Sequence, residues 1–266
     1  MQVELIAYST PANERYKYNP MKVVEQCASV CYDSEPDFHD YRIANGCAKS
    51  GHMSVYEHAY FTFHVSGISR ACLAQLSRHR HLSLSVRSQR YCDESGSGVF
   101  GCIIPKAFND EQLEIAMQTY REEMDKYQVL LASGAEKEDA RMVLPNAMET
   151  ELYLSANARA LIEASHLRLC NRAQEEIRTM FGKMKEEVEQ VSPEIAAMMV
   201  PKCEVNPNYP FCTERESCGR YPKLSEVYDN HKRNGNCEVK TNDTDDTERE
   251  DGRIALRVHN VQVRLR

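Results

Sequence analysis

The chain has 266 residues, 42% of them hydrophobic, and a formal net charge of -7 at pH 7. This length suits one large globular domain, or one domain with a small appendage. The acidic balance argues against a nucleic-acid polymer as partner, because phosphate backbones are bound through positive charge. No apolar run approaches the ~20 residues of a membrane helix, and the first residues lack the pattern of a signal peptide, so we expect a cytoplasmic protein without a membrane partner.

The first part of the chain predicts two strands and two helices. Residues 2–8 are predicted as a short strand, and Asn19-Pro20 has the pattern of a helix N-cap followed by proline at the first helical position. A second helix is expected to stop at Gly51. Residues 55–65 alternate between apolar and polar side chains, which predicts a strand whose polar face is either exposed or lines a pocket. The apolar face would carry Ala59, Phe61, Phe63 and Val65, and the polar face His58, Tyr60, Thr62 and His64.

The middle of the chain predicts helices separated by loops. Residues 69–79 are predicted as a short helix, 81–87 as a loop and 88–91 as an extended segment. The glycine-rich stretch 95–98 is read as a surface turn or, alternatively, as a lid. Two longer helices follow, over 110–131 and 172–190, because their apolar residues step by three and four. Their stripes are Leu113, Met117, Tyr120, Met124, Tyr127 and Leu131, and Ala173, Ile177, Met180, Phe181, Met184 and Val188.

The last part of the chain has a different composition. Most of the eleven cysteines are expected to be reduced, but four of them lie among Pro, Asn and Gly over 203–237. Their spacing is not a standard zinc pattern; free thiols are the favoured interpretation and a four-thiolate metal site the alternative. Residues 242–251 are acidic and predicted to be disordered. We therefore expect one main domain over 1–223, to which the resemblance described below assigns catalysis, and a partly disordered extension over 224–266. The four cysteines are Cys203, Cys212, Cys218 and Cys237.

A basic cluster occupies residues 75–91, QLSRHRHLSLSVRSQRY, which contain no acidic residue. The planar fork of arginine suits phosphate, so the cluster predicts an anion site; the alternative is a solvated surface with scattered ion pairs. Helical spacing places Gln75, Arg78 and His79 on one face, and an extended 88–91 would place Ser88 and Arg90 on another. The histidines His79 and His81 lack Cys or carboxylate partners at metal-ligand spacing, so no metal is expected. The arginines are Arg78, Arg80, Arg87 and Arg90.

The triplet Arg78-His79-Arg80, followed after seven residues by Ser88 and then by Arg90, resembles the signature of flavin-dependent thymidylate synthases. Further blocks resemble the same family in the same order, and the resemblance covers about residues 1–200. These blocks are Glu57-His58 with Phe61-Thr62-Phe63-His64-Val65, Arg141 with Val143-Leu144-Pro145, Asn157-Ala158-Arg159, Arg168, Ala173-Gln174 and Glu176-Ile177-Arg178.

The resemblance implies a fold, a reaction and an assembly. The fold is α+β, a twisted and mainly antiparallel sheet flanked by helices, as in thymidylate synthase-complementing proteins. The reaction is the reductive methylation of dUMP to dTMP with methylenetetrahydrofolate as carbon donor, FAD as cofactor and NADPH as reductant. The assembly is a homotetramer whose active sites are shared between subunits.

The resemblance also implies roles for individual residues. The flavin-binding positions are Arg78, His79, Arg80, Asn157 and Arg159, with His58 near flavin and folate. The dUMP-binding positions are Gln75, Arg78, Ser88, Arg90, Arg141 and Arg168. Among these, Arg168 would stabilise negative charge on the uracil ring. Ser88 would position dUMP through its hydroxyl, because no adjacent base activates it as a nucleophile. Catalysis is therefore assigned to Arg168, Ser88 and His58.

The sequence departs from the family pattern at one point. The family usually has Asn-Glu three and two residues before the signature serine, where this chain has Ser85 and Val86. The missing glutamate removes an acceptor for flavin or nucleotide, so the alternative function is a catalytically impaired homologue that binds flavin or nucleotide. A nucleic-acid or phosphoprotein-binding module is a further alternative, which the acidic net charge disfavours.

Overall fold

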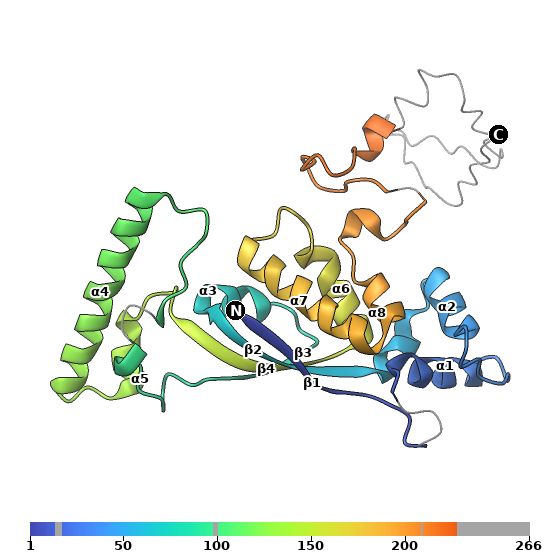
Figure 1. Ribbon diagram of the computed structural model, residues 1–266, viewed down its shortest axis with the longest axis horizontal. Coiled ribbons are helices and arrows are strands. Elements are labelled where there is room, and N and C mark those ends of the chain that lie inside the picture. Colours follow the sequence, from blue (N-terminus) through green and yellow to red (C-terminus); the bar gives the residue numbers. More distant parts are fainter. Residues whose placement is uncertain (14–17, 98–100, 209, 228–266) are drawn as a thin grey trace, which may run out of the picture. The chain divides into compact units, whose positions relative to one another are not determined.

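The computed structural model describes residues 1–13, 18–97, 101–208 and 210–227. The chain divides into two units, Met1–Leu224 and Ser225–Arg266, and the elements named below belong to the first (Figure 1). Within the described residues, each helix is either too short or too polar to cross a lipid bilayer. With η for a 3-10 helix, the elements are β1 (Gln2–Tyr8), α1 (Pro20–Val30), α2 (Arg42–Lys49), η2 (Met53–His58), β2 (Tyr60–Ser69), α3 (Arg70–Leu76), β3 (Leu82–Val86), η3 (Ser95–Ser97), α4 (Asp110–Ala132), α5 (Lys137–Ala140), η5 (Arg141–Val143), β4 (Glu149–Asn157), α6 (Ala158–Arg168), α7 (Glu175–Val191), α8 (Pro193–Met198) and η6 (Lys202–Glu204).

Four strands form one sheet in the order β1-β2-β4-β3, and each neighbouring pair is antiparallel. The register aligns the inward residues of the central strands: Phe63 of β2 lies opposite Leu154 of β4, and Leu84 of β3 lies opposite the same leucine. The β2–β4 register shifts between Val65 and Ile68. The predicted α+β fold with a mainly antiparallel sheet is therefore confirmed.

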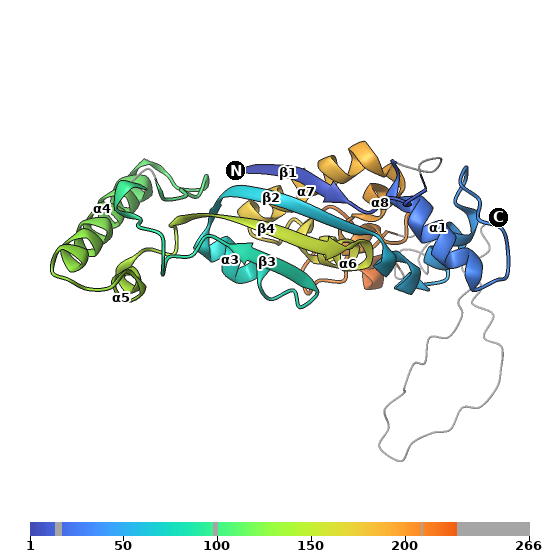
Figure 2. The ribbon, with the colours of Figure 1, turned by 90° about the horizontal axis from the view of Figure 1, so that it is seen from below.

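Helices cover one face of the sheet and leave the other face open, which Figure 2 shows from the open side. The covered face carries Phe61, Phe63 and Val65, which are fully buried as predicted. The open face is polar: the hydroxyls of Thr62 and Ser155 lie 2.9 Å apart. The helix stripe that packs on the covered face contains Ile177, Met180, Phe181, Met184 and Val188 of α7, also as predicted.

Side-chain caps define where several helices begin. Asn19 caps α1 by accepting a hydrogen bond from the Met21 N–H at 2.8 Å, and proline follows it, as predicted. The N-cap of α2, Tyr41, has a left-handed backbone with φ +48° and makes no side-chain cap. Instead, the fully buried carboxylate of Glu25 accepts the N–H groups of Ile43 at 3.2 Å and Ala44 at 2.7 Å. A carboxylate from α1 therefore caps α2.

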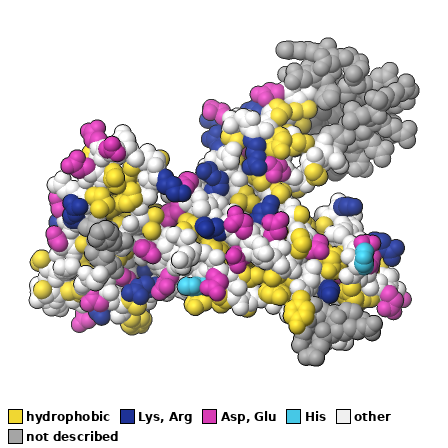
Figure 3. Space-filling model, viewed as in Figure 1, with side chains coloured by type: hydrophobic (Ala, Val, Ile, Leu, Met, Phe, Trp, Pro, Cys, Tyr) yellow, Lys and Arg dark blue, Asp and Glu magenta, His cyan; other side chains and the backbone are white. Residues whose placement is uncertain are grey.

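Helix α4 lies beside α5 at one end of the sheet (Figure 1). Its predicted stripe is buried only in part: Met124 and Tyr127 are buried, whereas Leu113 is 38% exposed. The surface of α4 shows further hydrophobic side chains (Figure 3). The largest exposed ones are Ile115, 60% exposed, and Val129, 67% exposed. The helix therefore carries apolar surface on more than one side.

The structure corrects four of the predicted elements. The helix predicted over 69–79 ends at Leu76, so Arg78 and His79 lie in the following turn and share no helical face with Gln75. The strand predicted over 55–65 begins only at Tyr60, because 53–58 form the 3-10 helix η2 that carries His58. The loop predicted over 81–87 contains strand β3, whose alternate side chains pack on the core. The extended segment predicted over 88–91 is a turn, in which the Cys92 N–H donates to the Ser88 carbonyl at 2.9 Å. The basic cluster is therefore a helix, a strand and a turn.

Candidate functional site

The predicted site residues fall into three groups, and the first lies where α3 meets α6. Helix α3 starts at a fixed point, because the Ser69 N–H and hydroxyl donate to both carboxylate oxygens of Glu176 on α7, at 2.6 and 2.7 Å. The Ser69 hydroxyl in turn accepts from the Cys72 N–H at 3.0 Å. This double contact fixes the start of the helix that carries Gln75 and leads into the signature triplet.

Arg168, the last residue of α6, contacts both Gln75 and His79 of that first group. Its Nε donates to Nε2 of His79 at 2.8 Å, and its Nη2 donates to the Gln75 carbonyl at 3.1 Å. Burial, and then the charge of Arg168, hold the pKa of His79 below its ordinary value. A neutral imidazole is what this contact requires, because Nε2 acts as the acceptor. Among the described residues the other N–H donors of Arg168 have no partner, so they are available for a ligand.

Arg78 and Arg80 flank His79 on the turn after α3, and both are exposed. Within the described residues, neither guanidinium makes a hydrogen bond or an ion pair. The side chain of Gln75 points back to α7, where its amide contacts Gln174. The two arginines therefore present free planar donors of the kind that bind phosphate in pairs.

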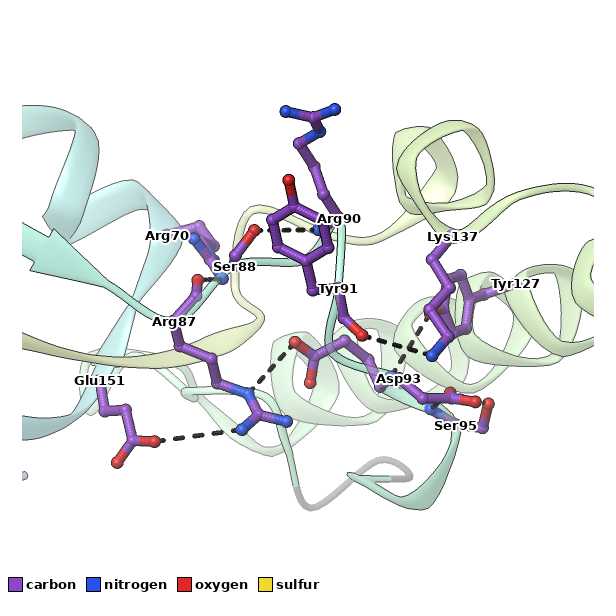
Figure 4. Close-up of polar contacts among 11 residues, drawn as sticks. Arg70, Arg87, Ser88, Arg90, Tyr91, Asp93, Ser95, Tyr127, Lys137 and Glu151 are labelled. Atoms are coloured by element: carbon purple, nitrogen blue, oxygen red, sulfur yellow. Dashed lines mark hydrogen bonds and ion pairs between the residues drawn. The ribbon is translucent and has the colours of Figure 1, made fainter.

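The second group gathers Ser88, Arg90 and Arg141 near α5. The Ser88 hydroxyl accepts the Arg90 N–H at 3.3 Å, within the turn (Figure 4). The Arg90 guanidinium pairs with Glu138 at 2.7 Å, and the Nε of Arg141 donates to the carbonyl of the same glutamate at 3.0 Å. An anion bound at Arg90 would therefore compete with Glu138.

An ion pair between Arg87 and a buried carboxylate supports this turn, and the sequence did not predict it. The Glu94 side chain is only 2% exposed, and one of its carboxylate oxygens lies 3.4 Å from Nε of Arg87. Arg70 donates to the Arg87 carbonyl at 2.8 Å, and burial lowers the pKa of Arg70. The available signal was that Asp93-Glu94 are the first acidic residues after the basic cluster. The pair ties the signature turn to β3 and α3.

The third group contains His58, Asn157 and Arg159. Asn157 caps α6, with its Oδ1 accepting the Ala160 N–H at 2.8 Å. Arg159 pairs with Glu57, the neighbour of His58, at 2.8 Å. The contact brings together residues about a hundred positions apart, and His58 itself is exposed at the end of η2. The capping role leaves the Asn157 amide N–H groups for a ligand.

The two residues that depart from the family pattern lie on β3. Val86 packs against the core, on the same side as Leu82 and Leu84. Ser85 lies on the open face, opposite Tyr153 of β4. The apolar residue at 86 therefore fits its packing, whereas a carboxylate there would meet apolar neighbours.

A cavity of about 340 Å³ opens beside Arg168, between the end of α6 and the segment after α8. The cavity is lined by Cys170 and by three of the cysteines of the C-terminal part, Cys203, Cys212 and Cys218. In the part of the chain that the structure describes, no three His, Cys, Asp or Glu side chains are grouped to hold a metal ion. Cys237 lies outside the described residues.

Comparison with known proteins gives a consistent family. The family model described as thymidylate synthase complementing protein matches residues 14–194. A flavin-dependent thymidylate synthase of Clostridium tetani is 36% identical over 80% of this chain and 94% of its own length, and that of Geobacter sulfurreducens is 41% identical over 67% and 76%. That of Saccharolobus solfataricus is 40% identical over 60% of this chain, and the match spans only 61% of the relative.

Solved structures show the same fold. The Helicobacter pylori flavin-dependent thymidylate synthase complexed with FAD and dUMP has a TM-score of 0.54 and 25% identity, over 70% of this chain and 93% of that one. A UMP/dUMP methylase from Streptomyces cacaoi, bound with 5-Br dUMP, has a TM-score of 0.60 over 79% and 95%, at 22% identity. The second likeness, at that identity, speaks for the fold alone.

Proposed function

Since this chain belongs to the thymidylate synthase complementing protein family, we propose that it is a flavin-dependent thymidylate synthase that converts dUMP to dTMP. The co-substrates would be methylenetetrahydrofolate and NADPH, with FAD as cofactor. The observation that carries the proposal is that a chain matching the family over 14–194 also joins Gln75, His79 and Arg168 by direct hydrogen bonds.

The residues of the first and third groups fit a flavin dinucleotide. Its phosphates need several donors, and the exposed guanidiniums of Arg78 and Arg80 supply planar ones. Asn157 and Arg159 add donors at the start of α6, and His58 lies next to them. When bound, FAD would supply the redox chemistry that amino-acid side chains lack.

The residues of the first and second groups fit dUMP. Arg90, Arg141 and the Ser88 hydroxyl offer donors for a phosphate, with Gln75 and Arg78 as further contacts. Arg168 would face the uracil ring, where a fixed guanidinium stabilises developing negative charge. Its contact with His79 holds that guanidinium in one orientation before the substrate binds, so little reorganisation is needed during the reaction.

A homotetramer with shared active sites is part of the same proposal. The three groups are carried by different parts of the chain, so one way to unite them is to combine groups from different subunits. The exposed apolar residues of α4, Leu113, Ile115 and Val129, are the surface we propose for subunit contacts.

The remaining parts of the proposal concern domains and compartment. We assign catalysis to residues 1–223 and treat 224–266 as an extension; the disorder expected there falls on residues that, from 228 onward, lie outside the described ones. A cytoplasmic location is supported by the cysteines, which are free thiols throughout the described residues, as expected in a reducing compartment.

The test is to measure flavin absorption of the purified protein, then anaerobic NADPH oxidation with and without dUMP, and dTMP formed with methylenetetrahydrofolate. We expect bound flavin, oxidation stimulated by dUMP, and dTMP. Arg168→Ala should lower kcat/KM for dUMP by about 10²–10³-fold, as for loss of one charge-stabilising donor. The matched control is Arg172→Ala, whose guanidinium contacts the Glu216 carbonyl at 3.1 Å. A protein that binds no flavin and forms no dTMP would overturn the proposal.

A further inference from the structure

Four thiols converge on the cavity beside Arg168, and the proposed reaction uses none of them. Cys170 lies in the loop between α6 and α7, inside the stretch that matches the family. Cys203 belongs to η6, beyond that match, and the irregular segment that follows η6 carries Cys212 and Cys218. The cavity therefore lies between residues that match the family model and a segment that follows the matched stretch.

Two contacts fix the geometry of this cavity. Nδ1 of His166 on α6 lies 2.8 Å from the Val200 carbonyl. His166 precedes Cys170 by four residues, and Val200 precedes Cys203 by three. The amide of Asn171 donates to Sγ of Cys218 at 3.7 Å. Elements α6 and η6 also pack against each other. Each of the two cysteines therefore lies a few residues after one partner of the His166–Val200 contact.

Both thiols line the same cavity. Burial is the main reason why the pKa of Cys203 is raised, and Glu204 and Cys170 add to it, while Arg220 opposes it. Both thiols are half-buried, whereas Cys212 is buried and Cys218 exposed. Because the described thiols are not grouped as metal ligands, pairwise thiol chemistry suits the cavity better than a metal.

We propose that Cys170 and Cys203 form a reversible disulfide that switches the site at Arg168. The oxidant is a peroxide. One thiol is oxidised to a sulfenic acid with release of one water; the sulfur of the second thiol then attacks the sulfenic sulfur, the S–O bond breaks and a second water leaves. In sum, two thiols lose two electrons and two protons, and hydrogen peroxide becomes two molecules of water. A dithiol reductant reverses the step.

The switch would act through the short loop after α6. Cys170 follows Arg168 by two residues, and the loop ends at Gln174, whose side chain contacts Gln75. A disulfide requires a bond of about 2.05 Å and Cα atoms about 4.4–6.8 Å apart, so it fixes the loop in one conformation. That constraint on the loop between Arg168 and Gln174 would disturb the contacts of Arg168 with His79 and of Gln174 with Gln75. This effect on activity rests on the proposed function, whereas the disulfide itself does not.

The test treats the full chain with hydrogen peroxide, removes the peroxide with catalase, blocks remaining thiols and maps cross-linked peptides by mass spectrometry. We expect a Cys170–Cys203 peptide, and a fall in dUMP turnover of about tenfold or more, because displacements near 1 Å can cost up to ~10²-fold. A dithiol should restore the turnover. Cys170→Ser and Cys203→Ser should each abolish the peptide and resist peroxide. Cys31→Ser, which removes an exposed thiol at the end of α1, should leave the switch intact.

Three outcomes would overturn the inference. The first is a peptide map without the Cys170–Cys203 link. The second is stoichiometric zinc in the purified chain that Cys203→Ser loses. The third is a disulfide that forms without changing turnover, which would refute the coupling to Arg168. If the reduced enzyme forms no dTMP, the proposed function fails, while the peptide map still decides whether the two thiols pair.

Discussion

The contact between Arg168 and His79 depends on one proton. Nε of Arg168 is always a donor, so the hydrogen bond exists only while Nε2 of His79 is unprotonated. Burial and the neighbouring positive charge both lower the pKa of this histidine from its ordinary value of 6.5. The two residues are 89 positions apart in the chain, so the geometry of the site is sensitive to pH at this one imidazole.

We predict that the free energy of unfolding falls as the pH drops from 6.5 to the lowered pKa of His79. Between the lowered pKa and 6.5, the unfolded chain binds more protons at this residue than the folded one, so unfolding becomes more favourable. Well above 6.5 the residue is unprotonated in both states and contributes no slope. The measurement is the thermal midpoint at about pH 7 and about pH 5, for wild type and His79→Gln. The variant should lose part of the drop; an identical drop in both proteins would contradict the prediction.

At the residue scale, the sequence predicted a set of site residues but not how their side chains meet. The basic cluster and the family motifs named Ser88 and Arg90 together, and they do lie together. They meet through a turn, however, and not on one face of a strand, because the Ser88 carbonyl accepts the N–H groups that follow it. Glu94 was missed because burial of a carboxylate depends on Arg87 and α4 packing around it, which spacing does not encode. The roles assigned to these residues remain predictions.

At the scale of elements, the start of α2 depends on a carboxylate from another helix. Glu25 accepts three backbone N–H groups, those of Asp37 at 3.0 Å, Ile43 and Ala44. Without it, one buried and two partly buried donors would lose their acceptor, and the left-handed N-cap residue Tyr41 offers no side-chain replacement.

We predict that Glu25→Ala destabilises the fold by about 3 kcal/mol, since buried donors without acceptors cost about 1–3 kcal/mol each and some would regain water. Urea denaturation measures the change. Glu35→Ala, at an exposed carboxylate nearby, is the control and should stay near zero. A loss for Glu25→Ala as small as that of the control would show that α2 does not need this cap.

The shift of register in β2 makes a second prediction at this scale. Gly67 has φ +72°, and a Cβ there would lie 2.6 Å from the Met1 backbone nitrogen. Gly67→Ala should therefore destabilise the fold by about 1–3 kcal/mol. Gly46→Ala is the matched control: its Cβ would meet nothing within 4 Å on helix α2, so it should be neutral or stabilising by about 0.5–1 kcal/mol. Equal effects of the two substitutions would contradict the argument, with both measured by thermal unfolding.

Elements with a strong periodicity were predictable, and those defined by distant pairing were not. Helices α4 and α7 and strand β1 follow from local patterns that the structure keeps. Strand β3 was read as a loop because serine and arginine surround its short alternation of Leu82, Leu84 and Val86. Its partner β4 was not predicted at all. The pairing of Leu84 with Leu154 spans seventy residues, and only the folded sheet reveals it.

At the scale of the whole molecule, the exposed face of α4 is the surface on which the proposed assembly depends. Glutamate at both Ile115 and Val129 should break subunit contacts, because two charges would enter an apolar interface. We expect light scattering to show a mass below that of the tetramer, with unchanged circular dichroism. The control is Val30→Glu, at an exposed valine on α1. A tetramer that survives the double substitution would move the interface away from α4.

The proposed assembly does not follow from local sequence patterns. The family resemblance implied a shared site, whereas periodicity predicted that the stripe on α4 would be buried within one chain. The structure leaves Leu113 of that stripe exposed, because the helix lies beside α5 at the end of the sheet and only its inner side meets the core. Which residues complete a site between chains depends on surfaces that fold into place only in the complete molecule.

Helix α6 has Asn157 before its first residue and Arg168 as its last. Eleven residues at about 1.5 Å each place the two about 16 Å apart, and a helix of this length behaves as a rigid spacer. A ligand that touched both ends in one chain would have to be as long as the helix, whereas a compact ligand must take one end from each of two chains. One inserted residue in α6 would turn Arg168 by about 100°, so the length of this helix is as much a part of the site as the side chains at its ends.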